Sequence, residues 1–302
     1  MAKAVFTTKA KPGYDDLPEE RYHFPRTYLN AAKSALGDWI VYYEPRRSTA
    51  DLSSSGGRQS YFATARLVDI RPDPARADRF YGYVEHYLEF DDAVPFREAG
   101  FYYEQSLRKA DGTTNKGRFG RSVRPLPDTE YHVILAAGFQ RQAHEAQPFV
   151  ADNPARIGTG NPVVPERPVF EQLIHRPFRD RVFSTAVKQA YNNTCAITGL
   201  RIINGGGRPE VQAAHIRPVA ANGPDSMRNG LALCGTAHWM FDRGLISVRD
   251  DYALLLKESA IPEPFFRIIN DDRRLKLPAA PAQRPHPNFL RFHRKRVFGI
   301  HP

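Results

Sequence analysis

The chain has 302 residues, of which 41% are apolar and 12% aromatic, which favours two domains of ordinary size and excludes a disordered chain. Its 43 basic residues outnumber its 33 acidic ones, so a polyanion is the expected partner. Two cysteines exclude a disulfide scaffold. Because the sequence has neither an apolar leader nor an apolar run of about 18 residues, we expect a cytoplasmic protein that binds no membrane.

The N-terminal part reads as a β-rich domain. Residues 1–30 are polar and interrupted by prolines, so we expect an arm there and not a core element. From Gly37 onwards, short runs of aromatic and β-branched residues alternate with turn-forming clusters, a pattern typical of short strands. We predict a β-rich core at about 31–140, within a domain that spans 1–140. The expected strands lie at 37–45, 60–70, 81–90 and 130–139.

A second domain follows a linker. Residues 141–168 are rich in Ala, Pro and Gly without periodicity, which predicts the linker. The domain at 169–302 opens with helical spacing of apolar residues at 170–191, and no acidic residue follows Asp272 in its basic tail. The expected fold class is α+β with two domains.

The most informative stretch lies in the second domain. Residues 211–219 are expected to form a strand that ends in a turn at Pro218, and 231–234 a second short strand. Residues 236–244 are expected to form a helix. Strand, loop, strand and helix in this order predict a ββα unit.

Four polar residues of this unit fit the needs of phosphodiester hydrolysis. His215 lies near the end of the first expected strand, and a neutral imidazole can deprotonate water near pH 7. Asn229, in the loop before the second strand, can hold the base by bonding backbone carbonyls or the imidazole. His238 and Asp242 are four residues apart, so they project from one helix face and can share a divalent cation.

The run AAHIRPVAANGPDSMRNGLALCGTAHWMFDRGLIS resembles the core of HNH (ββα-metal) endonucleases. The resemblance implies that His215 is the general base, Asn229 the middle asparagine and His238 a metal ligand, with Asp242 as a second ligand. It also implies double-stranded DNA as the substrate and Mg²⁺ or Mn²⁺ as the cofactor, with other transition metals possible.

Two departures from the family pattern affect metal binding. Ala214 stands where many relatives place another ligand, so the metal shell is thinner on the strand side. Relatives often carry two Cys-x-x-Cys pairs, but here Thr198 and Ala237 follow Cys195 and Cys234, so we expect two neighbouring buried thiols and no structural zinc.

Other side chains near the motif have a functional and a structural interpretation. Trp239 and Phe241 are expected in the helix core rather than inserted into DNA, and Glu210 is expected to be structural. Several arginines beside the motif and in the tail could bind phosphates, with a solvated surface as the alternative. The expected DNA contacts are Arg217, Arg243, Arg294 and Arg296.

The N-terminal pattern GDWIVYYEPRR…YFATARLVDIRPDP…VEHYLEFDDAVPF resembles PUA-superfamily domains of the EVE type. Such domains fused to HNH nucleases resemble readers of 5-methyl- or 5-hydroxymethylcytosine that flip the base out of the duplex. A flipped base needs aromatic stacking faces and polar groups that read its edge. The candidate pocket is Trp39, Tyr43, Glu44, Tyr61 and Asp91, and an ordinary hydrophobic core is the alternative for its aromatic members.

Three functions are therefore open. The first is a modification-dependent restriction endonuclease, and the second an HNH nuclease whose N-terminal domain does not read modified bases. The third is a catalytically degenerate DNA-binding protein, which Ala214 keeps possible. A double-strand cut requires two nicks on opposite strands, so a homodimer or sequential nicking is expected.

Overall fold

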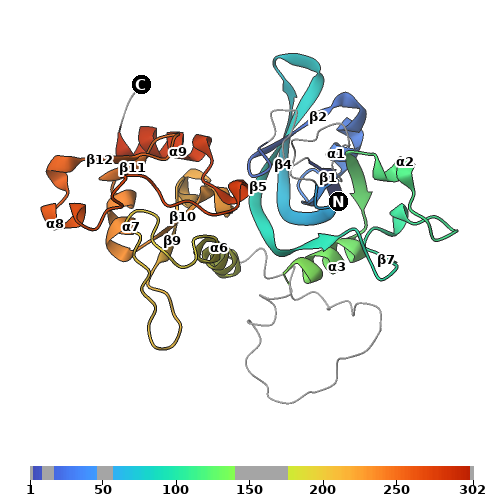
Figure 1. Cartoon of the computed structure of the whole chain (residues 1–302). Coiled ribbons are helices and arrows are strands. Elements are labelled where there is room, and N and C mark those ends of the chain that lie inside the picture. The colour runs from blue at the N-terminus through green and yellow to red at the C-terminus, as the bar shows by residue number, and fades with distance from the viewer. Residues whose placement is uncertain (1–2, 9–16, 46–56, 140–175, 300–302) are drawn as a thin grey trace. The chain divides into compact units, whose positions relative to one another are not determined.

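The computed structural model describes residues 3–8, 17–45, 57–139 and 176–299. The chain divides into two compact units, Met1–Phe178 and Arg179–Pro302 (Figure 1). Each unit has its own cluster of buried apolar side chains, which confirms the α+β class with two domains. The predicted linker at 141–168 lies outside the described residues. No helix of the described part has the length and apolar character needed to cross a membrane.

The N-terminal unit is built on a six-stranded sheet in the order β2-β5-β4-β3-β1-β8. β1 runs parallel to β3, and the other neighbouring strands are antiparallel. Repeated register shifts between β4 and β5 accompany the curl of the sheet that Figure 1 shows. The strands are β1 (Lys3–Thr7), β2 (Arg21–Pro25), β3 (Trp39–Glu44), β4 (Ser60–Asp73), β5 (Arg76–Pro95) and β8 (Val123–Leu126), and β6 (Arg97–Glu98) pairs with β7 (Phe101–Tyr102).

The expectation of an N-terminal arm is wrong. β1 lies between β3 and β8 inside the sheet, and Ala4, Val5 and Phe6 are fully buried. This apolar run is short and surrounded by polar residues, so its local pattern does not reveal that long-range pairing with β3 buries it on both faces.

The predicted strand at 130–139 is also wrong, because these residues belong to helix α3 (Asp128–Gly138). The buried side chains Tyr131, Ile134 and Leu135 recur at helical and not at strand spacing. Two carboxylates in the first turn, Asp128 and Glu130, stabilise the helix because their negative charges lie at the positive end of its dipole. The described part of this unit also contains the α-helices α1 (Leu29–Ser34) and α2 (Lys116–Phe119).

The C-terminal unit has the predicted ββα order. β9 (Gln212–His215) and β10 (Gly230–Leu233) pair antiparallel, and α7 (Gly235–Asp242) follows and packs on them. The predicted helix at 170–191 is confirmed over its described part as α6 (Arg176–Ala190). The other elements are β11 (Ile246–Val248), β12 (Leu254–Leu256), α8 (Glu263–Phe266), α9 (Pro287–His293) and a π-helical turn at Arg294–Phe298.

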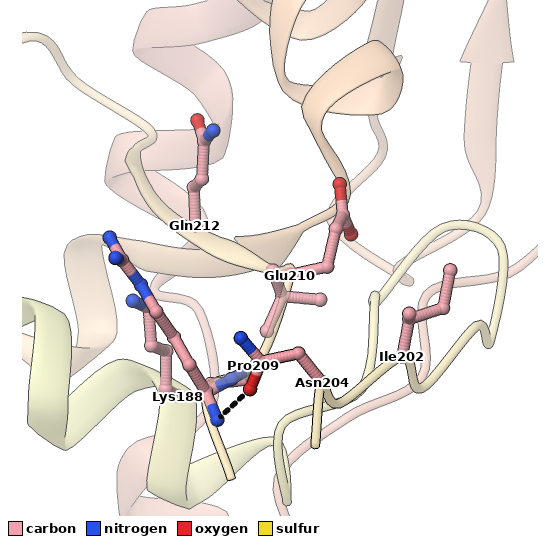
Figure 2. A pocket seen from close by; sticks show the side chains of 8 residues that line it. Lys188, Ile202, Asn204, Pro209, Glu210 and Gln212 are labelled. Carbon is pink, nitrogen blue, oxygen red and sulfur yellow. Dashed lines mark hydrogen bonds between the residues drawn. The ribbon is translucent and has the colours of Figure 1, made fainter. Parts of the chain in front are cut away.

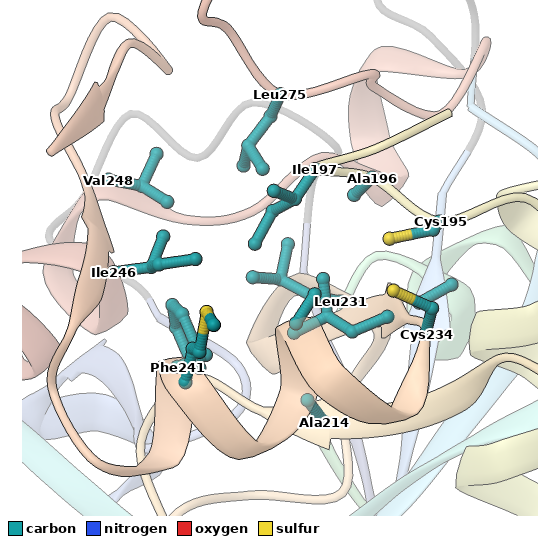
Figure 3. Close-up of a cluster of buried hydrophobic side chains, with 14 of the residues drawn as sticks. Cys195, Ala196, Ile197, Ala214, Leu231, Cys234, Phe241, Ile246, Val248 and Leu275 are labelled. Atoms are coloured by element: carbon teal, nitrogen blue, oxygen red, sulfur yellow. The ribbon is translucent and has the colours of Figure 1, made fainter. Parts of the chain in front are cut away.

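A hydrophobic core fixes α7 against the strands. Ala237, Met240 and Phe241 form its buried face, and Leu231 of β10 and Ile246 of β11 pack in the same cluster (Figure 3). The prediction that Phe241 is core is confirmed. Because this face is buried, the opposite face of α7 is the one presented to solvent.

Candidate active site

His215 stands at the end of β9 in a tightly defined setting. Its ring stacks on Phe183 of α6, with centroids 3.9 Å and planes 15° apart. Its Nε2 lies 2.9 Å from Oδ1 of the buried Asp225, whose Oδ2 accepts from Arg179 Nε at 3.3 Å. When Nε2 donates to this carboxylate, the lone pair resides on Nδ1, the nitrogen that can accept a proton.

Asn229 fixes the loop that follows His215. The asparagine is fully buried, and its Oδ1 accepts from the backbone N–H of Arg217 at 2.8 Å. Its Nδ2 donates to the carbonyls of Arg217 at 3.0 Å and Pro224 at 2.9 Å. The side chain therefore uses three hydrogen bonds to close the loop, which is the backbone-bonding role predicted for it.

The same loop depends on a close backbone approach at Gly223. A Cβ at this position would lie 1.8 Å from the carbonyl oxygen of Arg217. Only glycine fits such an approach. Gly223 thereby lets the chain turn back toward Asp225, the partner of His215.

His238 lies on the solvent side of α7 between two polar partners. Its Nε2 is 3.4 Å from Asp242 Oδ2, one helical turn further on. Its Nδ1 is 2.8 Å from Oε1 of Gln212, at the start of β9. Donation from Nδ1 to the amide oxygen leaves the Nε2 lone pair on the side of Asp242, where a cation could be coordinated.

The pair fits a divalent cation only in part. Two ligands that each lie about 2 Å from one cation are about 3 to 3.5 Å apart, and the 3.4 Å between His238 and Asp242 matches this spacing. No group of three or more His, Cys, Asp or Glu side chains within the described ranges could hold a metal. The Ala214 side chain is fully buried and supplies no ligand, so further coordination has to come from a backbone carbonyl, water or DNA phosphate.

Glu210 secures the beginning of α7. Its Oε1 accepts from the backbone N–H of Gly235 at 2.8 Å, and thus satisfies one of the free donors at the helix N-terminus. This contact confirms the structural interpretation of Glu210.

The two cysteines lie side by side under the start of α7 (Figure 3). Both are buried, and the hydrogen bond with Cys234 lowers the pKa of the Cys195 thiol. Thr198 contributes a contact of 3.9 Å between its Oγ1 and Cys234 Sγ. The prediction of neighbouring buried thiols is confirmed.

A hollow of about 360 Å³ adjoins the start of β9 (Figure 2). Lys188 and Arg208 bring positive charge to its wall, and Gln212 connects it with His238. The other lining residues are Ile202, Asn204, Pro209, Glu210 and Val211.

The four arginines predicted to contact DNA have different surroundings. Arg243 and Arg296 are exposed. Arg217 donates from Nε to the carbonyl of Ala221 at 2.7 Å and lies over the ring of Phe292. Arg294 donates to the carbonyl of Val248 at 2.8 Å and to Asp250 Oδ1 at 2.7 Å. These internal bonds give Arg294 a structural role and do not support the prediction that it contacts DNA.

Trp239 departs from the prediction, because its side chain is 58% exposed and not part of the core. The buried residues Ala237, Met240 and Phe241 define the opposite side of α7. Periodicity alone would have placed Trp239 outside, since it is about 200° from Ala237 around the helix.

The predicted base pocket lies largely in packed interior. Tyr43 and Tyr61 are fully buried, and burial raises the pKa of both phenols. The Tyr61 hydroxyl donates to Glu104 at 2.7 Å, and Glu104 in turn forms a buried ion pair with Arg124 at 2.6 Å. These neighbours fill the space that a flipped base would need, so the assignment of both tyrosines to an open pocket is corrected.

The other three pocket candidates differ in their burial and contacts. Glu44 is buried and bonded to Arg58, and Trp39 is 5% exposed and stacked with His86. Asp91 on β5 is partly exposed. The aromatic strands were predicted correctly, but the alternation of aromatic and polar residues along a strand does not distinguish a ligand pocket from a hydrophobic core.

Comparison with known proteins agrees with the site geometry. Residues 195–249 match the family model for HNH endonuclease. This segment is an HNH endonuclease domain. No protein with a curated description matches the chain significantly.

Two solved structures show distant likeness. The "Modification dependent TagI restriction endonuclease" is 17% identical, with a TM-score of 0.32, over 97% of this chain and 81% of the TagI chain. The "N-terminal domain of Staphylothermus marinus McrB" is 13% identical, with a TM-score of 0.31, over 45% of this chain and 94% of that domain. Likeness of this size carries no argument about the activity of this chain.

Proposed function

We propose that the chain is a metal-dependent endodeoxyribonuclease. The observation that carries this proposal is that one ββα unit holds two separate histidine–carboxylate pairs, one suited to a general base and one to a metal site. His215 at the end of β9 is bonded to Asp225, and His238 on α7 is paired with Asp242. A base that is held in place and a two-ligand metal pair on neighbouring elements are what phosphodiester hydrolysis requires.

His215 acts as the general base in this proposal. Nδ1 takes a proton from the attacking water, while Asp225 stabilises the imidazolium through Nε2. Asn229 keeps the loop closed so that the ring does not turn away. His238 and Asp242 would hold Mg²⁺ or Mn²⁺, which when bound neutralises charge on the cleaved phosphate.

We further propose that the N-terminal unit reads a modified cytosine, 5-methyl- or 5-hydroxymethylcytosine, by base flipping. The sequence resemblance of this unit to EVE-type domains supports the proposal, together with its separate, sheet-based fold. The buried Tyr43 and Tyr61 are not part of it. Cleavage of both strands requires two nicks, which two chains or sequential nicking can supply, and we propose a cytoplasmic homodimer.

The test uses three plasmids of one sequence that carry cytosine, 5-methylcytosine or 5-hydroxymethylcytosine. The full chain is incubated with each plasmid in Mg²⁺, Mn²⁺ or EDTA, and nicked and linear products are measured. We expect metal-dependent cleavage of modified DNA only. Equal cleavage of all three plasmids would overturn the reader proposal and keep the nuclease.

The degenerate alternative has its own outcome in this assay. If no plasmid is cut in either metal, the nuclease proposal fails and the degenerate DNA-binding alternative is left. Cleavage by His215→Ala at a rate within five-fold of wild type would contradict the proposed role of His215.

A further inference from the structure

Trp239 is the most exposed large apolar side chain among the described residues. It follows the metal ligand His238 directly on α7. An indole that is 58% exposed loses favourable burial unless a partner covers it. Its position beside the metal pair suggests that the partner is the substrate.

Charge around Trp239 favours a nucleic acid as that partner. The Arg243 guanidinium lies over the indole, 6.0 Å from its ring centroid. At about 100° per residue, His238, Asp242, Trp239 and Arg243 follow one another around about 140° of the helix surface. The metal pair and the aromatic–basic pair thus form one continuous strip on the solvent side of α7.

We propose that Trp239 and Arg243 form a contact for the DNA strand beside the cut phosphate. The indole packs against a deoxyribose, and the guanidinium binds an adjacent phosphate. This inference rests on the proposed nuclease function and adds to it a contact that positions the strand at the metal pair. Binding through Trp239 aligns the substrate but leaves the chemical step to His215 and the metal.

Intrinsic fluorescence tests the contact without any cleavage. The chain has two tryptophans, and Trp39 is 5% exposed, so a change on DNA binding reports mainly on Trp239. A 30-base-pair duplex is titrated in EDTA into wild type and Trp239→Phe. We expect quenching and a blue shift in wild type and less than a tenth of that change in the variant. An equal change in both proteins would overturn the proposal.

Cleavage kinetics provide the second test. Trp239→Ala is expected to raise KM for the best-cut plasmid about 10-fold, with a much smaller effect on kcat, while Trp239→Phe recovers most of the affinity. Ile268→Ala is the matched control, since Ile268 is also an exposed apolar residue but lies beyond α8. A fall in kcat at constant KM would contradict the proposal.

These tests separate the contact from the nuclease proposal. If wild type cuts no DNA, the nuclease proposal fails, while the fluorescence titration still decides whether Trp239 meets DNA. If wild type cuts DNA and Trp239→Ala has the wild-type KM, only the contact fails. Loss of a dimer in sedimentation by Trp239→Ala, with unchanged DNA affinity, would assign the indole to a second copy of the chain and overturn the proposal.

Discussion

The two ends of β9 hold two histidine environments that differ in the burial of the carboxylate beside each histidine. His215 is 16% exposed in its side chain, stacked on an aromatic ring and bonded to a buried carboxylate. The His238 side chain is 22% exposed, and its partner Asp242 is 55% exposed, whereas Asp225 beside His215 is 4% exposed. A base has to be held at a fixed angle, whereas metal ligands have to be open to water, cation and phosphate.

The two histidines are held by contacts with different elements of the domain. Phe183 and Arg179 of α6 support the base end, so the helix before the motif is part of the site. The metal end relies on α7 itself and on Gln212. Loss of support should therefore affect the chemical step at one end and the metal requirement at the other.

The largest effect is expected from His215→Ala. Removing the general base should lower kcat for plasmid cleavage by about 10² to 10⁴-fold, while DNA affinity in EDTA is retained. His132→Ala on α3 of the N-terminal unit changes a histidine outside both candidate sites and serves as the control. A loss of less than five-fold would remove His215 from the role of base.

A smaller effect should distinguish the two supporting residues. Asp225→Asn is expected to lower kcat about 10 to 100-fold at unchanged metal requirement, since the carboxylate orients the base. Gln212→Ala should instead raise the Mn²⁺ concentration needed for half-maximal cleavage by about 10-fold. Asp271→Asn, an exposed carboxylate outside the site, is the control. The reverse pattern would contradict the division of labour.

The buried His293 provides a structural contrast to both site histidines. Burial lowers its pKa to about 4 from 6.5, and its Nδ1 and Nε2 meet Ser247 and the carbonyl of Phe241. Because the folded pKa is depressed, the unfolded chain takes up the proton first as the pH falls. The stability contribution is complete above about pH 6.5 and is lost progressively toward pH 4.

At pH 5 this loss amounts to about 2 kcal/mol for His293. Urea unfolding at pH 7 and pH 5 should show it, and His293→Gln should make the stability less sensitive to this change. His286 has a similarly lowered pKa, because of its burial, and accounts for some of the remaining sensitivity. An unchanged pH dependence in His293→Gln would contradict this role.

The smallest expected effect is that of metal removal on the thermal stability of the protein. Cys195 and Cys234 pack in the core with Thr198 as their polar neighbour, so we predict that no zinc is needed to hold the unit together. EDTA should abolish cleavage and shift Tm by less than about 2 °C. A large fall in Tm, with zinc detected in the purified protein, would show a structural metal.

Much of the site followed from local patterns in the sequence. The ββα order, the turn at Pro218 and the pairing of His238 with Asp242 are determined within a few residues of chain. The bond between His215 and Asp225 was not predicted, because it depends on how Gly223 and Asn229 fold the loop. The contribution of α6 was not predicted either, since its contacts are distant in sequence.

The errors outside the site have related causes. β1 was missed because its place in the sheet depends on non-local pairing, and α3 was taken for a strand because Tyr131, Val133 and Ile134 suit either structure. Tyr43 and Tyr61 were assigned to the base pocket because tyrosine is common both in aromatic ligand pockets and in hydrophobic cores. Only their packing with Glu104 and Arg124 distinguishes the two.

Mn²⁺ binding to His215→Ala and His238→Ala tests the central claim most directly. Calorimetric titration in the presence of unmodified DNA, which is not expected to be cut, would be compared for both variants and wild type. The account predicts that His215→Ala binds Mn²⁺ as wild type does but does not cut, and that His238→Ala loses both metal binding and cleavage. Metal binding that depends on His215, or that survives the loss of His238, would contradict it.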